Sequence, residues 1–114
     1  MYVRINQVKF PNKMSKDAVD SHAQNLFDDF GKSGRLMRMI IDVSEISHVA
    51  LSVWKDKESF KKNGYDEISK FSQRLKEMGA IISSSEGNAR LELSDLFDVK
   101  NFIKSNNKWE NIFF

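Results

Sequence analysis

The sequence predicts an α+β domain with the element order β-α-β-β-α-β, followed by a short helix and an aromatic tail. Three observations support this class. Two segments repeat apolar residues at helical spacing, several short segments alternate apolar and polar residues, and Gly, Asn or Pro stands at most boundaries between them. A chain of 114 residues is long enough for one such domain with its own core.

The first strand and the first helix are predicted within the first 31 residues. Apolar and polar side chains alternate over residues 2–10, with room for a change of face near Gln7, and Pro11 ends the strand. Ser15 is a suitable N-cap for a helix, because its hydroxyl can accept a hydrogen bond from a free backbone N–H. Apolar residues then recur at helical spacing until Gly31, which fits the position just past the helix end.

The middle of the chain predicts a hairpin and a second helical region. Residues 35–43 and 48–54 are strand-like and are joined by a short connection. Asp56 can cap a short helical turn over residues 57–62, because its carboxylate can accept hydrogen bonds from the first backbone N–H groups. A longer helix is predicted over residues 66–78, with apolar residues on one face.

The last third of the chain predicts two strand segments and a C-terminal appendage. Residues 80–85 and 89–93 are strand-like on either side of a turn at Gly87-Asn88. A short helix is predicted over residues 95–104, and residues 109–114 carry three aromatic side chains. We therefore expect residues 1–93 to form the domain and residues 94–114 to pack on it or on a dimer partner.

This element order is that of the ferredoxin-like fold, in which helices cover one face of a four-stranded antiparallel sheet. Setting Asp42 opposite His48 in the hairpin gives one entirely apolar face, which we expect to pack against the helices. That apolar sheet face consists of Met37, Met39, Ile41, Val43, Val49, Leu51 and Val53. The mixed sheet face consists of Tyr2, Arg4, Asn6, Leu36, Arg38, Ile40, His48, Ala50, Ser52 and Trp54. We expect the mixed face to be bare and to associate with a second copy.

The segment from Leu51 to Phe60 (Leu-Ser-Val-Trp-Lys-Asp-Lys-Glu-Ser-Phe) combines a strand ending in Val-Trp, a charged turn, and Phe six residues after Trp. It resembles the dimeric α+β barrel superfamily, and most of all its antibiotic-biosynthesis-monooxygenase and haem-degrading-monooxygenase group. The likeness extends in element order over about residues 1–93. It implies a ferredoxin-like protomer, a homodimer that forms a dimeric α/β barrel, and a cleft in each subunit.

Individual positions can be compared with that group. Its haem-degrading members have a substrate-contacting Asn on the first strand, and Asn6 occupies the matching place. Their functional Trp and iron-ligating His correspond here to Asn63 and approximately to Gln73, and the second long helix contains no His. The resemblance therefore disfavours haem degradation and points instead to a cofactor-independent monooxygenase, which needs a base and a dry pocket.

Several residues of the mixed sheet face are candidates for ligand chemistry. His48, near Asp42, is a candidate base, because imidazole titrates near neutral pH and a carboxylate can orient it; a polar pair at the hairpin end is the alternative. Arg4 and Arg38 need anions if they are desolvated, either a protein carboxylate or the carboxylate of a ligand. The remaining candidate ligand-binding residues are Tyr2, Leu36, Ile40, Ser52 and Trp54.

Composition excludes several other classes of function. The absence of Cys removes disulfides and thiolate chemistry, and 18 basic against 16 acidic residues form no nucleic-acid-binding excess. No apolar run exceeds three residues, so we expect neither a membrane span nor a signal peptide and a cytoplasmic location. We expect no metal and no cofactor. The leading hypothesis is a homodimer that binds a small apolar or fatty-acid-like ligand; the alternative is a dimeric interaction module without a ligand.

Overall fold

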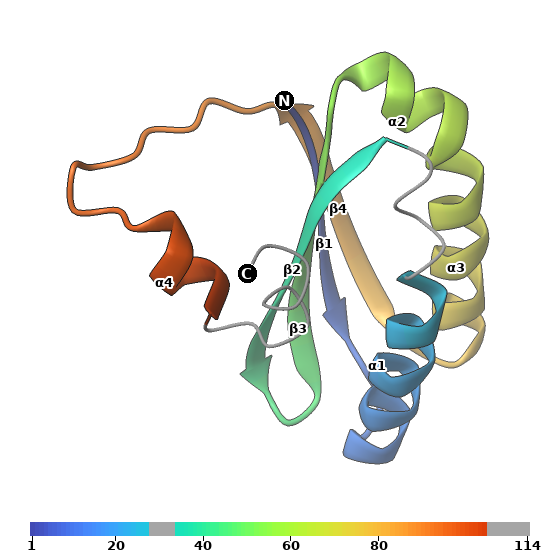
Figure 1. Cartoon of the computed structure of the whole chain (residues 1–114). Coiled ribbons are helices and arrows are strands. Elements are labelled where there is room, and N and C mark those ends of the chain that lie inside the picture. The colour runs from blue at the N-terminus through green and yellow to red at the C-terminus, as the bar shows by residue number, and fades with distance from the viewer. Residues whose placement is uncertain (28–33, 105–114) are drawn as a thin grey trace.

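The computed structural model describes residues 1–27 and 34–104 of the chain. Four antiparallel strands form one sheet in the order β2-β3-β1-β4. Helices α1, α2 and α3 lie on one side of this sheet, and α4 lies on the other side (Figure 1). The elements are β1 Tyr2–Lys9, α1 Lys13–Phe27, β2 Arg35–Ser44, β3 Ser47–Trp54, α2 Lys57–Asn63, α3 Tyr65–Glu77, β4 Ile81–Asn88 and α4 Val99–Lys104. The predicted ferredoxin-like α+β fold is confirmed.

Local hydrogen bonds decide where the helices begin and end. Asn12 Oδ1 accepts a bond of 2.8 Å from the backbone N–H of Ser15, so α1 begins before the predicted N-cap Ser15. Asp56 caps α2 as predicted, accepting from the N–H of Ser59 at 2.7 Å. Gly79 follows α3 with a φ of +93°, a conformation that favours glycine. The predicted end of α1 at Gly31 lies outside the described residues.

The C-terminal part of the sheet differs from the prediction. Gly87 and Asn88 form no turn, because they belong to β4 and pair with Val3 and Tyr2 of β1. The predicted strand over residues 89–93 does not form within this chain. The N–H of Ala89 still donates to the carbonyl of Met1 at 2.9 Å, next to the last paired residues Tyr2 and Asn88. The helix predicted over residues 95–104 is confirmed only for Val99–Lys104.

The register of the central hairpin follows the prediction with one interruption. Asp42 pairs with His48, and Arg38 pairs with Ser52, as expected. An irregularity between Arg35 and Met37 then places Arg35, rather than Leu36, opposite Trp54. Leu36 is consequently exposed, and Arg35 joins the residues on the mixed sheet face.

The helices cover the mixed sheet face, so the predicted assignment of the two faces is wrong. Tyr2 and Trp54 pack on Phe60 of α2, with ring centroids 5.4 and 5.5 Å apart. The same face continues along β1 through Val8, without a switch at Gln7, into a second cluster with Phe10, Val19, Leu75 and Ala80. The large aromatic side chains of the mixed face thus supply the core, and His48 lies against Asp20 of α1.

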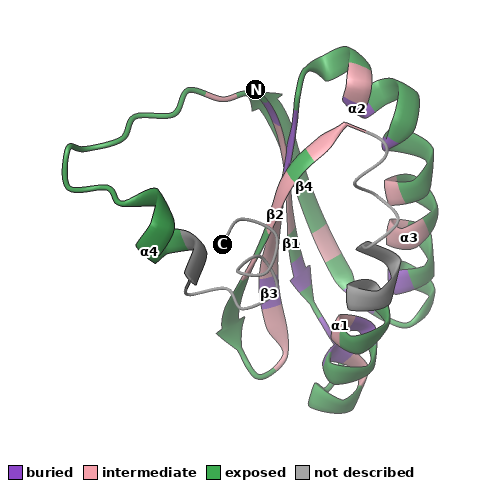
Figure 2. Ribbon diagram, viewed as in Figure 1, coloured by how far each residue is buried: buried purple, intermediate pink, exposed green. Residues whose placement is uncertain are grey.

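The apolar sheet face lies away from α1, α2 and α3. Its residues on β2 are the most accessible: Met39, Ile41 and Val43 are 39%, 48% and 63% exposed. Figure 2 shows this exposure at the arrow end of β2 and along most of the segment between β4 and α4. A sheet face this apolar is rarely left uncovered in a monomer.

Candidate functional site

A cavity of about 140 Å³ lies between the mixed sheet face and the helices. Its apolar walls include Val8, Val19, Trp54, Ile68, Phe71 and Leu75. Its polar lining on the sheet consists of Asn6, Arg35, Arg38, His48 and Ser52. Glu67, Lys70 and Arg74 of α3 also line it. A largely apolar pocket with a few polar groups is the usual form of a small-molecule site.

The cavity brings together five of the residues proposed from sequence: Asn6, Arg38, His48, Ser52 and Trp54. The other four, Tyr2, Arg4, Leu36 and Ile40, are not among the described residues that line it. The role of all nine residues in catalysis or ligand binding stays a prediction. The site lies between sheet and helices and not on the bare side of the sheet.

His48 is a buried imidazole at the hairpin end of the cavity. Its side chain is 5% exposed and packs edge-on against Phe10, with ring centroids 5.2 Å apart. Burial lowers the pKa of His48, because the charged form loses its hydration; the carboxylate of Asp20 opposes this shift, and the charges of Lys16 and Arg38 reinforce it. His48 is therefore neutral at pH 7 and able to accept a proton.

Lys16 connects two carboxylates beside His48. Its Nζ donates to Asp42 Oδ1 at 2.8 Å and to Asp20 Oδ2 at 3.0 Å, and its side chain is only 8% exposed. These bonds raise the pKa of Lys16 and lower that of Asp42. Ligand atoms of Asp20, Asp42 and His48 lie within 4.8 Å of one another, a spacing that could hold a metal ion. The Lys16 ammonium already binds both carboxylates and offsets one of their two negative charges.

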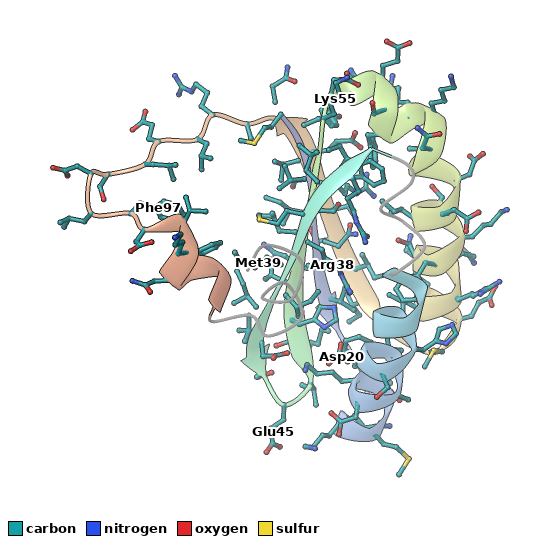
Figure 3. All side chains as sticks on the ribbon, in the orientation of Figure 1. Asp20, Arg38, Met39, Glu45, Lys55 and Phe97 are labelled. Carbon is teal, nitrogen blue, oxygen red and sulfur yellow. The ribbon has the colours of Figure 1, made fainter. Side chains whose placement is uncertain are left out.

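Sequence reasoning found Asp42 but missed Lys16 and Asp20. Figure 3 shows Asp20 on the side of α1 that faces the sheet. A signal was present, because Lys16, Val19 and Asp20 are spaced i, i+3 and i+4 and so share one helix face. A Lys-Asp pair beside a buried valine on the inner face of a helix indicates a partner across the interface.

Arg35 and Arg38 place two positive charges at the cavity. Burial lowers the pKa of each to about 10, and for Arg38 the neighbouring charge of Arg35 adds to the effect. Both guanidinium groups remain charged at neutral pH, since a pKa of about 10 lies well above 7. Figure 3 shows Arg38 and Met39 on opposite sides of β2, with Arg38 directed toward the helices. The site can therefore attract an anionic group.

Arg4 has a protein carboxylate as its partner. Its Nη1 lies 2.7 Å from Glu86 Oε1, and Tyr2 donates its hydroxyl to the other oxygen of Glu86. Arg4 Nε and Ser84 Oγ also donate to Asn6 Oδ1, at 3.2 and 2.7 Å. Two donors on Oδ1 fix the orientation of the Asn6 amide and leave its NH2 group as the end available to a ligand.

Trp54 forms a fully buried wall of the cavity. Its Nε1 donates to Ser52 Oγ at 3.2 Å, and its six-membered ring lies against the backbone at Gly64, between α2 and α3. A Cβ atom at position 64 would stand 2.4 Å from Trp54 Cη2. The glycine is thus required by close approach of the indole ring and not by its backbone conformation, whose φ is −118°.

Sequence comparisons find no matching protein-family model and no curated protein with significant similarity. Structural comparison gives clear neighbours. A variant of SnoaB, a cofactor-independent oxygenase from Streptomyces nogalater, aligns with a TM-score of 0.64 at 15% identity, over 82% of this chain and 97% of that chain. A Deinococcus radiodurans protein, assigned by inference as an antibiotic biosynthesis monooxygenase, gives 0.66 at 9% identity, over 85% and 100%. A dimeric ferredoxin-like protein from an uncultured marine organism gives 0.62 at 15% identity, over 82% and 99%.

These neighbours are the antibiotic-biosynthesis-monooxygenase-like and dimeric ferredoxin-like proteins that the sequence resembles. The fold of the predicted superfamily is therefore confirmed for this chain. Among the described residues, no helix is both long and apolar enough to cross a membrane.

Proposed function

We propose that this chain forms a homodimer in which each subunit binds a small aromatic acid between sheet and helices and oxidises it with O2, without a cofactor. The observation that carries this proposal is the composition of the cavity. Apolar side chains form most of the pocket wall, and β2 and β3 add two charged guanidinium groups and one neutral imidazole to it.

The size of the cavity favours a compact aromatic ring over a long acyl chain. Its volume of about 140 Å³ is close to that of an engineered apolar cavity of about 150 Å³ that binds benzene. Phe71 and Trp54 offer aromatic surface to such a ring. A carboxylate or phenolate on the ring would complement Arg35 and Arg38.

The apolar sheet face supports the homodimer. Met39, Ile41 and Val43 are exposed on β2, and a two-fold contact would cover this face on both subunits at once. One structural neighbour is itself described as a dimeric ferredoxin-like protein. The same surface would be costly to hydrate in a lone subunit.

In the proposed reaction His48 accepts a proton from an electron-rich substrate. The resulting anion is the electron donor and O2 is the oxidant: a substrate CH2 group becomes C=O, one oxygen atom enters the product, and the other leaves as water. The four electrons that reduce O2 come from the substrate. His48 is suited to this step because it is neutral, and Asp20, 3.1 Å away, would stabilise the imidazolium. A neighbour described as a cofactor-independent oxygenase supports this class of reaction.

Thermal unfolding in the presence of a ligand panel tests binding. We expect aromatic carboxylic acids to raise the melting temperature and their matched primary amides to do so much less, because only the acids complement the two guanidinium groups. Arg38→Met should remove the difference between acid and amide. Equal stabilisation by acid and amide would reject the proposed ligand class.

Oxygen consumption tests the reaction. Acids that bind and carry an activated CH2 group should consume one O2 per product in the presence of a metal chelator. His48→Gln should abolish this consumption while leaving the acid-dependent rise in melting temperature intact. Consumption that persists in His48→Gln would reject His48 as the base.

A further inference from the structure

His48 Nδ1 is a buried nitrogen that faces a carboxylate without forming a hydrogen bond. It lies 3.1 Å from Asp20 Oδ1, and the imidazole side chain is only 5% exposed. Among the side chains that the structure describes, it is the buried nitrogen or oxygen atom that has no hydrogen-bond partner. A buried polar atom without a partner costs free energy, so this contact indicates a place for a further group.

The carboxylates beside His48 share a single ammonium. Lys16 Nζ donates to Asp20 Oδ2 at 3.0 Å and to Asp42 Oδ1 at 2.8 Å, and so offsets one of their two negative charges. Lys16 makes no hydrogen bond to the imidazole among the bonds that the described side chains form. A cation with two positive charges and an affinity for nitrogen would satisfy all three groups at once.

We propose that Asp20, Asp42 and His48 bind a Zn²⁺ ion in exchange for the Lys16 ammonium. The ion takes His48 Nδ1, Asp20 Oδ1 and one oxygen of Asp42 as ligands, with water in the fourth position. Zinc suits this set because it accepts imidazole nitrogen together with carboxylate oxygen, whereas Mg²⁺ prefers oxygen ligands alone. Spacing along the sequence does not reveal the site, because its ligands come from α1, β2 and β3.

The distances between the ligand atoms agree with this ion. Zinc bonds of about 2.0–2.2 Å in a tetrahedral site place the ligand atoms about 3.3–3.6 Å apart. His48 Nδ1 and Asp20 Oδ1 already lie 3.1 Å apart, and the ligand atoms of all three residues lie within 4.8 Å of one another. A movement of about 1–1.5 Å by Asp42 therefore completes the set. Its side chain is 66% exposed near the end of β2, so protein atoms leave it room to rotate.

Lys16 can give up its position to the ion. Its side chain is a flexible four-carbon stem, and the exposed Asp42 leaves the cluster open to solvent on one side. The ammonium can therefore swing into water, where its hydration replaces the two hydrogen bonds that it loses. Zinc and Lys16 compete for the same carboxylates, and substitution of Lys16 measures that competition.

Zinc on Nδ1 would prevent His48 from acting as a base. A neutral imidazole carries one proton, and with Nδ1 bound to zinc that proton stays on Nε2. The ring then has no lone pair with which to accept a proton from a substrate. This consequence rests on the proposed function, whereas the metal site itself rests on the geometry of the cluster.

Equilibrium binding of Zn²⁺ to the full chain tests the site. Protein freed of metal by a chelator and then dialysed is titrated with Zn²⁺ in competition with a chromophoric chelator. We expect one zinc ion per chain, which excess Mg²⁺ does not displace. Lys16→Met should bind zinc at least about tenfold more tightly, because no ammonium competes for the carboxylates. Asp42→Asn and His48→Gln should each bind zinc at least about tenfold more weakly.

His22→Gln and Lys13→Met are the matched controls. His22 is the other imidazole of the chain and is exposed on α1, and Lys13 forms its ion pair with Asp17. Both variants should bind zinc as the unaltered chain does. Equal affinity in the unaltered chain and in Lys16→Met would overturn the exchange. Unchanged affinity in Asp42→Asn and His48→Gln, or no binding by the unaltered chain, would reject the site.

NMR of the ¹⁵N-labelled chain gives a measurement that needs no substitution. Zinc should shift the Nδ1 resonance of His48 and leave the ring nitrogens of His22 in place; the reverse result rejects the site. Oxygen consumption then separates this inference from the proposed function. Zinc that binds at His48 without slowing the oxidation rejects His48 as the base while the metal site stands. Oxidation without any zinc binding rejects the metal site alone.

Discussion

His48 Nδ1 lies 3.1 Å from Asp20 Oδ1, and no hydrogen bond joins the two atoms. The distance is short enough for a bond, so the direction of the contact and not its length excludes one. Asp20 uses its two oxygens differently. Oδ1 lies next to His48, and Oδ2 accepts a hydrogen bond from Lys16 Nζ. Lys16 thus satisfies the carboxylate that would otherwise draw a proton onto His48.

The first prediction is that Lys16→Met raises the pKa of His48. Lys16 and Arg38 lower this pKa through their charge, whereas Asp20 and Asp42 raise it. Removing the ammonium leaves the two carboxylates in excess, so the imidazolium becomes more favourable. Titration of the His48 ring protons by NMR measures the change. The variant should also lose about 1–3 kcal/mol of stability, because buried polar partners are left unsatisfied.

Lys13→Met is the matched control for this prediction. Lys13 forms the exposed pair with Asp17 one turn earlier on the same helix, at 2.8 Å. Its removal should leave the titration of His48 unchanged and alter stability much less than Lys16→Met does, because solvent screens the exposed pair. A shift of His48 in the Lys13 variant as large as in the Lys16 variant would mean that helix charge in general, and not the contact, controls the imidazole.

The second prediction concerns the pH dependence of folding. The pKa of His48 is lower in the folded protein than its ordinary value of 6.5, so the unfolded chain binds the proton more readily. The contribution of His48 to the free energy of unfolding therefore has its full value above about pH 6.5. This contribution decreases as the pH falls from 6.5 to the lower pKa that His48 has in the folded protein.

Urea denaturation at several pH values between about 5 and 8 measures this slope. His48→Gln should unfold with a weaker dependence on pH over that interval, whatever its stability at pH 8. The substitution retains hydrogen-bonding capacity but cannot titrate. An unchanged slope would assign the pH dependence to other groups.

The sequence predicted the fold and the hairpin register because both depend on local patterns. Alternation along β2 and β3 placed Asp42 opposite His48, and the cap at Asp56 fixed the start of α2. The two faces of the sheet could not be assigned in the same way. A fully apolar face is expected to be buried, but whether a helix or another subunit buries it depends on contacts distant in sequence.

The site was predicted in part for the same reason. Periodicity placed Arg38, His48 and Trp54 on one face, and the structure brings them to one cavity. Arg35 was missed because the irregularity beside Leu36 changes the facing residue by one position, which no alternation pattern reveals. Lys16 and Asp20 were missed because their partners lie on strands, about 30 residues away along the chain.

The third prediction is that Arg38→Met separates ligand binding from folding. If Arg38 holds the carboxylate of a ligand, the variant should keep its dimer and bind aromatic acids about 1.5–3 kcal/mol more weakly. Calorimetric titration gives this difference. If its main role is instead to pair with a buried protein carboxylate, the variant should lose roughly 3–5 kcal/mol of stability. Unchanged binding and unchanged stability would contradict a role at the cavity.

The last prediction is that Gly64→Ala disturbs the wall of the cavity through Trp54. The added Cβ would stand 2.4 Å from Cη2 and 2.6 Å from Cζ2 of a side chain that is fully buried, so either the indole ring or the junction of α2 and α3 must move. Overpacking of this kind costs about 1–3 kcal/mol, which urea denaturation can resolve. The displaced ring should also weaken binding of aromatic acids, since it forms part of their site. Gly87→Ala on β4 is the control, because a Cβ there meets no atom within 4 Å. If Gly64→Ala is as stable as Gly87→Ala and binds the same ligands, Trp54 does not define the cavity.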